Sequence, residues 1–207
     1  MIVACIIAIW LTTALAQNDP VVWYRFNETG GTTGYDSSGG GKNATLVNGP
    51  TWVSGRDGNA VNLDGSNDYL SLPTGIVSAL NNYTIAAWVR LDTVSTWSRI
   101  FDIGTGTTIN MFLTPRSSSG SIRFAITTGG SGSEQRIDGS SALPAGTWKH
   151  VAVTLAGNTG ILYVDGVEVG RNSSMTLRPS SLGNTGNNYI GRSQYSDPYL
   201  DGRVDDF

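Results

Sequence analysis

The feature that most constrains this chain is a series of short apolar segments, recurring about every 8 to 15 residues and separated by turns rich in Gly, Asn and Ser. Residues 84–90 and 149–155 alternate between apolar and polar, and a period of two places one set of side chains in a core and the other outside it. No segment carries apolar residues at helical spacing. Asp165 and Gly166 form the dipeptide favoured in two-residue β-hairpin turns.

Composition agrees with this pattern. The chain has 3 Glu and 2 Lys against 13 Asp and 11 Arg, although Glu and Lys are the charged residues that helices prefer. The sequence therefore predicts an all-β fold, a two-sheet antiparallel β-sandwich or jelly roll, as one domain over residues 17–207. The predicted strands span residues 21–26, 60–63, 69–72, 83–91, 98–103, 109–113, 121–127, 147–155, 160–164, 167–171 and 189–191. The Gly- and Ser-rich stretch 129–133 is predicted to be a hairpin loop inside this domain.

The first sixteen residues have the character of a targeting segment. They are apolar, carry no charged side chain and end in Ala14-Leu15-Ala16, which predicts a secretory signal peptide cleaved before Gln17 and an extracellular protein. The alternative, a short membrane anchor, falls below the ~20 apolar residues needed to span a bilayer. Cys5, the only cysteine, lies in this segment. The mature chain would therefore contain no disulfide and would depend on core packing or a bound ion.

The other end of the chain also carries information. Residues 203–207 resemble the start of a strand, and no Gly or Pro turn follows Phe207. We therefore expect the sequence to be a fragment, truncated at the C-terminal end of its domain. A final strand or a further domain would follow.

Net charge argues against nucleic-acid binding, and the spacing of the acidic residues argues against glycoside hydrolysis. Lys and Arg total 13 against 16 Asp and Glu, so the chain lacks the basic surface that nucleic-acid binding needs. Glycoside hydrolysis uses two facing carboxylates, but no glutamate has an acidic neighbour two positions away, neither Glu28, Glu134 nor Glu168. Asp205 and Asp206 would point to opposite faces of a strand. We predict no catalytic residues, although neighbouring strands could still bring two Asp together.

Aromatic and planar polar residues suggest a sugar site. Aromatic rings cover the apolar faces of sugars, while Asn, Gln, Asp and Arg bind their hydroxyls. The tryptophans with apolar neighbours, Trp23, Trp88 and Trp148, are predicted to lie in the core. The single histidine, His150, is predicted to be packed in a strand and not catalytic. Trp97 instead has polar neighbours, and Tyr195 and Tyr199 lie in a polar loop. The predicted carbohydrate-binding residues are Trp97, Arg99, Asp102, Asn110, Gln194, Tyr195, Asp197 and Tyr199. Alternatively, Trp97 pairs across a hairpin and the tyrosine loop packs over an edge strand.

Several motifs in order resemble one known family. They are WYRFNE at 23–28, DSSG at 36–39, VNLDGSNDYL at 61–70, YTIAAWV at 83–89, GTWKHVAV at 146–153, LYVDG at 162–166 and GRVDDF at 202–207. Together they resemble the laminin-G-like (LamG type 3), concanavalin A-like jelly-roll family over about residues 21–207. This resemblance implies an extracellular two-sheet sandwich that often accompanies glycoside hydrolases and often carries structural calcium. Segments 97–104, 110–114 and 190–200 look like members attached to arabinan- or xylan-degrading enzymes.

The loop 36–43 offers oxygen ligands and a flexible backbone of the kind that calcium prefers. In the resembling family this loop lies close to the start and end of the domain. We therefore expect Asp36, Asn43 and Asp205 to form a structural calcium site. The alternative is an Asx turn in which Asp36 caps its own loop; the similar loop 64–68 is predicted to be a turn.

The sequence thus predicts a secreted, non-catalytic carbohydrate-binding module, accessory to a glycoside hydrolase acting on plant cell-wall arabinan or xylan. Its partners would be a polysaccharide or oligosaccharide and a catalytic domain in the same full-length protein, with no nucleic acid and, after signal cleavage, no membrane. One alternative is an adhesion or spacer domain that binds protein. A second is a divergent glycosidase.

Overall fold

A computed structural model describes residues 20–207, and the predicted signal peptide lies outside this range. Within it the chain forms fifteen strands and two short 3₁₀ helices. The strands are β1 Thr33–Gly34, β2 Ala44–Val47, β3 Thr51–Ser54, β4 Asn59–Asp64, β5 Tyr69–Ser71, β6 Tyr83–Thr93, β7 Phe101–Gly104, β8 Asn110–Thr114, β9 Arg123–Thr127, β10 Gln135–Asp138, β11 Trp148–Ala156, β12 Thr159–Val164, β13 Val167–Asn172, β14 Asn187–Ile190 and β15 Asp201–Asp205. The helices are η1 Ser131–Ser133 and η2 Pro179–Leu182.

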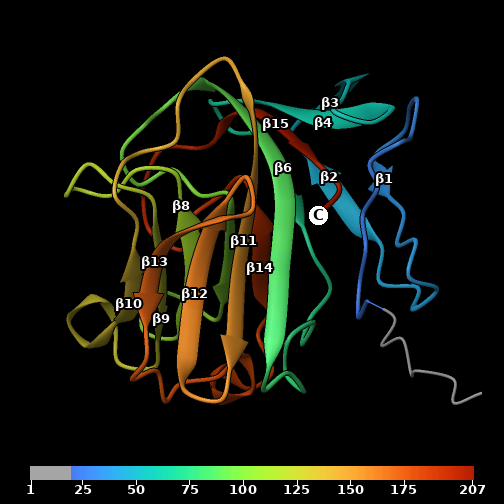
Figure 1. Cartoon of the computed structure of the whole chain (residues 1–207). Coiled ribbons are helices and arrows are strands. Elements are labelled where there is room, and N and C mark those ends of the chain that lie inside the picture. Colours follow the sequence, from blue (N-terminus) through green and yellow to red (C-terminus); the bar gives the residue numbers. More distant parts are fainter. Residues whose placement is uncertain (1–19) are drawn as a thin grey trace, which may run out of the picture.

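The strands form two antiparallel sheets packed as a sandwich, which confirms the predicted fold class. One sheet has the order β1-β2-β5-β14-β7-β8-β9-β10, and the other has the order β13-β12-β11-β6-β15-β4-β3. Figure 1 shows β6, β11 and β12 side by side in one layer, with β8 and β9 in the layer behind. No helix in residues 20–207 has the length and apolar character needed to cross a membrane.

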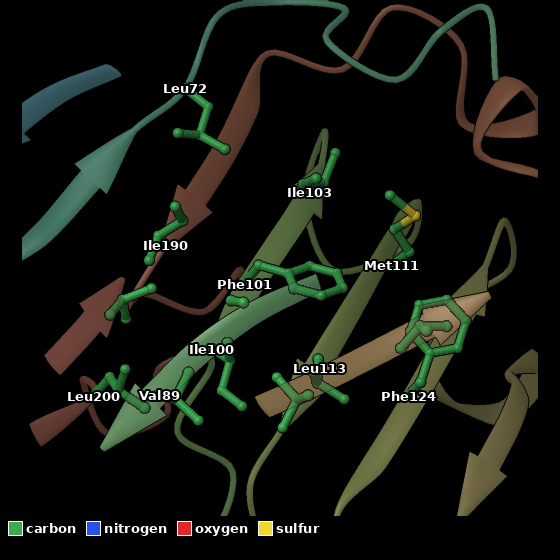
Figure 2. Packing of buried hydrophobic residues seen from close by; sticks show 14 of the residues in the cluster. Leu72, Val89, Ile100, Phe101, Ile103, Met111, Leu113, Phe124, Ile190 and Leu200 are labelled. Carbon is green, nitrogen blue, oxygen red and sulfur yellow. The ribbon is translucent and has the colours of Figure 1, made fainter. Parts of the chain in front are cut away.

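The core lies between the two sheets. Figure 2 shows Phe101, Ile103, Met111, Leu113 and Phe124 pointing into this space from β7, β8 and β9. The Phe101 and Phe124 rings lie 6.5 Å apart, and both side chains are buried. Burying each large apolar side chain contributes about 1.5–3 kcal/mol, so these strands are fixed with one face inward.

The predicted alternation holds in the two long central strands. β6 pairs with β11, and Ala87, Val89, Val151 and Val153 point into the core while the residues between them point outward. The predicted hairpin also forms, because Asp165 and Gly166 both have the positive φ, 51° and 77°, that a type I′ turn requires. Residues 129–133 join β9 to its antiparallel neighbour β10, as predicted.

The N-terminal prediction of a strand at 21–26 is wrong. Tyr24 makes only an isolated bridge to Asp36, and its backbone N–H and C=O pair with Phe207 at 2.8 and 2.9 Å. Phe26 adopts a φ of 54°, which is incompatible with a continuing strand. Trp23 was expected in the core but is 37% exposed, because its segment lies beside the sheets without joining either one.

The other differences concern short elements. Strands β1, β2, β3 and β10 are absent from the predicted set because they are two to four residues long. The strand start expected at 203–207 corresponds to β15, which begins two residues earlier, at Asp201. The predicted strand 98–103 begins only at Phe101, since residues 95–98 form a turn. Trp88 and Trp148 are half-buried on the outer face of their sheet, where Trp88 packs edge-on against His150 with ring centroids 5.3 Å apart.

Candidate functional site

The candidate site lies on the face of the eight-stranded sheet that is turned away from the core. Because side chains alternate along a strand, Asp102 and Phe112 point to this face while their neighbours point inward. The connections 94–100, 128–134 and 191–200 supply the other walls. Together they enclose a pocket of about 190 Å³, lined by Trp97, Arg99, Phe112, Ser131, Glu134, Tyr195 and Asp197.

Trp97 is held in an uncommon backbone conformation. Its φ is 67°, a region that non-glycine residues occupy only when the surroundings impose it. The backbone N–H of Trp97 donates to the carbonyl of Arg116 at 2.8 Å, and its ring meets Phe112 edge-on at 6.5 Å. The guanidinium carbon atoms of Arg99 and Arg123 lie 5.7 and 5.4 Å from the centre of the indole ring. These contacts fix the ring at the pocket wall.

Arg99 links three segments of the site. Its side chain is 2% exposed and forms ion pairs with Asp102 at 3.3 Å and with Asp197 at 2.9 Å. Its Nη1 donates to the carbonyl of Trp97 at 2.5 Å, and its guanidinium lies 4.0 Å from the ring centre of Phe112. Because its donors are used in this way, Arg99 holds these segments of the pocket together.

Asp102 and Asn110 lie beneath the pocket, fully buried. Asp102 Oδ2 accepts from the backbone N–H of Gln194 at 3.1 Å as well as from Arg99. Its Oδ1 has no hydrogen-bond partner among residues 20–207. Burial raises the pKa of Asp102 to about 7, against the opposing effect of Arg99. Asn110 donates to the carbonyl of Gly106 at 3.0 Å, so both residues support the loops above them.

The loop that carries Tyr195 and Asp197 is ordered by Ser193. The Ser193 hydroxyl donates to Asp197 Oδ2 at 2.9 Å and accepts from the Tyr195 N–H at 3.0 Å. The Tyr195 hydroxyl donates to the carbonyl of Thr107 at 2.8 Å, and burial raises its pKa. The side-chain amide of Gln194 donates to the carbonyl of Asn187 at 2.7 Å, which holds it against β14.

The eight predicted sugar-binding residues therefore occupy three places. Four of them line the pocket: Trp97, Arg99, Tyr195 and Asp197. Three lie below or behind it: Asp102, Asn110 and Gln194. Tyr199 lies in a separate aromatic cluster, 6.3 Å from Tyr69, where Arg192 contacts Tyr69 and Tyr189.

Three pocket residues were absent from the prediction: Phe112, Ser131 and Glu134. Alternation in β8 could have identified Phe112, because Met111 and Leu113 on either side are core residues. Ser131 and Glu134 carry no such signal, because they reach the pocket only when the β9–β10 loop folds over the sheet. Glu134 is half-buried, and burial raises its pKa against the opposing effect of Arg123 and Arg99.

The predicted metal ligands lie in two settings. Asp36 Oδ1 accepts from the N–H groups of Trp23 and Ser38 at 3.1 and 2.9 Å, and its Oδ2 accepts from Lys42 at 3.0 Å. These bonds lower the pKa of Asp36 to about 2, although burial acts in the opposite direction. Asn43 Oδ1 accepts from the N–H of Asp36 at 2.9 Å. This is the arrangement of the Asx-turn alternative.

Asp205 is fully buried on β15. Its Oδ2 accepts from the N–H groups of Arg56 and Asp57 at 2.7 and 3.1 Å, and its Oδ1 has no partner among residues 20–207. Burial raises its pKa. In the same part of the chain, no group of three or more His, Cys, Asp or Glu residues is placed to hold a metal ion.

A larger groove of about 550 Å³ lies at one end of the sandwich, but its chemistry is different. Most of its lining is aliphatic, including Val21, Leu72, Ile76 and Leu80, with Phe207 at one wall. Hydroxyl-rich ligands need several polar partners, and this groove offers few. We therefore place the candidate site at the smaller, polar pocket.

The fold and the pocket define a concanavalin A-like sandwich with a ring-lined site over one sheet. Residues 64–207 match the Laminin_G_3 family model, described as the concanavalin A-like lectin/glucanases superfamily. The chain belongs to this family, which confirms the resemblance inferred from its motifs. No curated protein sequence matches the chain.

Solved structures with the same fold include domains associated with sugars. Domain 4 of AbnA, a GH43 extracellular arabinanase from Geobacillus stearothermophilus in complex with arabinotriose, is 22% identical, with a TM-score of 0.76 over 90% of this chain and 89% of that chain. Residues 221–444 of an S-layer domain-containing protein from Clostridium thermocellum are 43% identical, with a TM-score of 0.51 over 90% and 91%. The CBM40 of the Ruminococcus gnavus IT-sialidase, bound to α2,3-sialyllactose, is 13% identical, with a TM-score of 0.54 over 63% and 77%.

Proposed function

We propose that this chain is a carbohydrate-binding domain and that the pocket at Trp97 takes one sugar ring. The observation that carries the proposal is the convergence of two aromatic rings, Trp97 and Tyr195, with the carboxylates of Glu134 and Asp197, over the buried ring of Phe112. Rings cover the apolar face of a sugar, and carboxylates accept from its hydroxyls. At about 190 Å³, the pocket is smaller than the ~300–1,000 Å³ typical of drug-sized ligands, which favours a single ring.

The comparisons support a glycan ligand and an accessory role. The neighbouring arabinanase domain was solved with arabinotriose and the neighbouring CBM40 with sialyllactose. We infer that this chain accompanies a glycoside hydrolase in the same full-length protein and binds arabinan or xylan. We also propose that it is secreted, because residues 1–16 have the pattern of a signal peptide and the arabinanase is extracellular.

Affinity electrophoresis in gels containing arabinan or xylan tests this function. Trp97→Ala or Tyr195→Ala should abolish the retardation of the domain, while thermal melts verify that each variant folds. Tyr35→Ala is the matched control, because Tyr35 is 60% exposed and lies outside the pocket lining. Retardation of both pocket variants equal to that of the wild type would reject this location. Absence of binding to any glycan on an array would favour the adhesion or spacer alternative.

A second function, glycoside hydrolysis, is favoured by one observation. Glu134 and Asp197 bring two carboxylates to one pocket, and their environments differ, since Asp197 is paired with Arg99 while burial raises the pKa of Glu134. Carboxylates in contrasting environments are what an acid and a base or nucleophile require. Release of reducing sugar that Glu134→Gln abolishes would establish this function. Binding without any release supports the non-catalytic proposal.

Structural calcium remains a proposal, and Asp205 supports it best. Its buried Oδ1 lacks a partner among residues 20–207, and an unpaired buried carboxylate oxygen is costly. Asp36 and Asn43 fit a metal less well, because backbone N–H groups already occupy the Asp36 oxygens and the Asn43 Oδ1. We therefore propose that Asp205 would be the principal ligand of a calcium ion that stabilises the fold.

A further inference from the structure

Among the residues that the structure describes, the positive charges around the Trp97 pocket are paired with carboxylates, whereas one negative charge is not paired with a cation. Two arginines contact the indole ring, and both are already neutralised. Arg99 pairs with Asp102 and Asp197, and Arg123 pairs with Asp138 at 2.6 Å. Arg136, the remaining cation close to Glu134, lies 3.3 Å from the same Asp138 and is 56% exposed.

Glu134 contrasts with these cations. It lines the pocket, yet none of the ion pairs or side-chain hydrogen bonds found in residues 20–207 involves its carboxylate. A half-buried carboxylate of this kind has lone pairs available to a ligand. It can accept hydrogen bonds from sugar hydroxyls, and such charge-assisted bonds are strong.

A negatively charged sugar would be repelled by the same carboxylates. Its carboxylate would enter a pocket that already holds Glu134 and Asp197, and like charges in a partly desolvated site repel. To recruit Arg99, it would have to break the buried pair to Asp102 and the partly buried pair to Asp197. Breaking a buried ion pair is strongly unfavourable.

We propose that this pocket selects uncharged sugars over acidic ones, and that Glu134 is the residue that sets this selectivity. The inference rests on the proposed carbohydrate-binding function and specifies the ligand class of the same site. It separates this chain from the neighbouring CBM40, whose ligand sialyllactose carries a carboxylate, despite the shared fold. The expected ligands are neutral pentose or hexose units at a chain end or along a polysaccharide.

Isothermal titration of the folded domain with two ligand classes tests this proposal. The neutral ligands are arabinotriose, xylotriose and the methyl ester of trigalacturonic acid, and the acidic ligands are α2,3-sialyllactose and trigalacturonic acid itself. We expect a neutral ligand to bind at least about 10-fold more tightly than any acidic one, a difference of about 1.4 kcal/mol. Glu134→Gln should weaken the binding of neutral ligands and reduce the ratio of the dissociation constants of the acidic and neutral ligands. Glu168→Gln, a carboxylate on β13 outside the pocket, should change neither.

The possible outcomes separate the two levels of the proposal. If an acidic ligand binds as tightly as the neutral ones and Trp97→Ala abolishes that binding, the carbohydrate-binding function stands and the selectivity is overturned. If Glu134→Gln leaves the ratio between the classes unchanged, Glu134 is not its determinant. If no ligand of either class binds the wild type, the proposed function itself fails, and the selectivity fails with it.

Discussion

The buried ion pair of Arg99 offers a sharp test of how the pocket is built. Arg99 is 2% exposed and Asp102 is fully buried, so Arg99→Leu would leave the buried Asp102 and the partly exposed Asp197 without the guanidinium that both contact. Removing one partner of a buried pair costs ~3–5 kcal/mol. For a domain of this size ~2–4 °C is lost per kcal/mol, so Tm should fall by about 6–20 °C.

The assay is thermal and urea unfolding at pH 7, followed by circular dichroism. Arg171→Leu is the control, because its ion pair with Glu168 is exposed and exposed pairs contribute little to stability. The double variant Arg99→Leu/Asp102→Asn should recover part of the loss, since position 102 then carries no buried ionisable group and only Asp197 still lacks its partner. A fall of less than about 3 °C for Arg99→Leu would refute the view that this pair organises the pocket.

Three further predictions concern stability. Burial raises the pKa of Asp102 to about 7, above the ~3.9 of an unfolded chain, so the folded state binds more protons and stability should fall as pH rises from about 4 to 7. Urea unfolding at several pH values measures this dependence, and Asp102→Asn should make the free energy of unfolding less dependent on pH. An unchanged pH dependence in the variant would mean that other groups cause it. Phe124→Ala should cost ~3–5 kcal/mol in urea unfolding because a cavity forms between the sheets, and a loss below ~1 kcal/mol would contradict the core described here. Calcium should raise Tm, EDTA should lower it, and Asp205→Asn should remove the response; a melt indifferent to both additions would contradict the calcium proposal.

Much of the fold could be predicted because its signals are local. The alternation in residues 84–90 and 149–155 identifies β6 and β11, since one face of each must be buried. Asp165 and Gly166 identify their hairpin because few residues accept two successive positive φ angles. The prediction for Trp23 was wrong. Its apolar neighbours suggest a buried strand, but its segment joins neither sheet and the side chain is 37% exposed.

The pocket was predictable only in part. Trp97 and Tyr195 were identified because aromatic residues in polar surroundings are unusual, and the structure brings them to one pocket across 98 positions of sequence. Asp102 and Asn110 also belong to this region but lie beneath it, because strand alternation fixes the face and not the depth of burial. Glu134 could not be identified from spacing, since its place depends on how the loop after β9 folds over Phe112.

The most direct test of the account follows the tryptophan indole N–H signals by NMR while a neutral trisaccharide such as arabinotriose is added. Trp97 lines the pocket, whereas the indoles of Trp52 and Trp23 donate to the carbonyl of Gly31 and to Asp206 and serve as internal references. We expect a saturable shift of the Trp97 signal while the signals of Trp52 and Trp23 stay in place. A saturable shift of the Trp23 or Trp52 signal with an unchanged Trp97 signal would contradict binding at this pocket. The absence of any shift in the indole signals would contradict it as well.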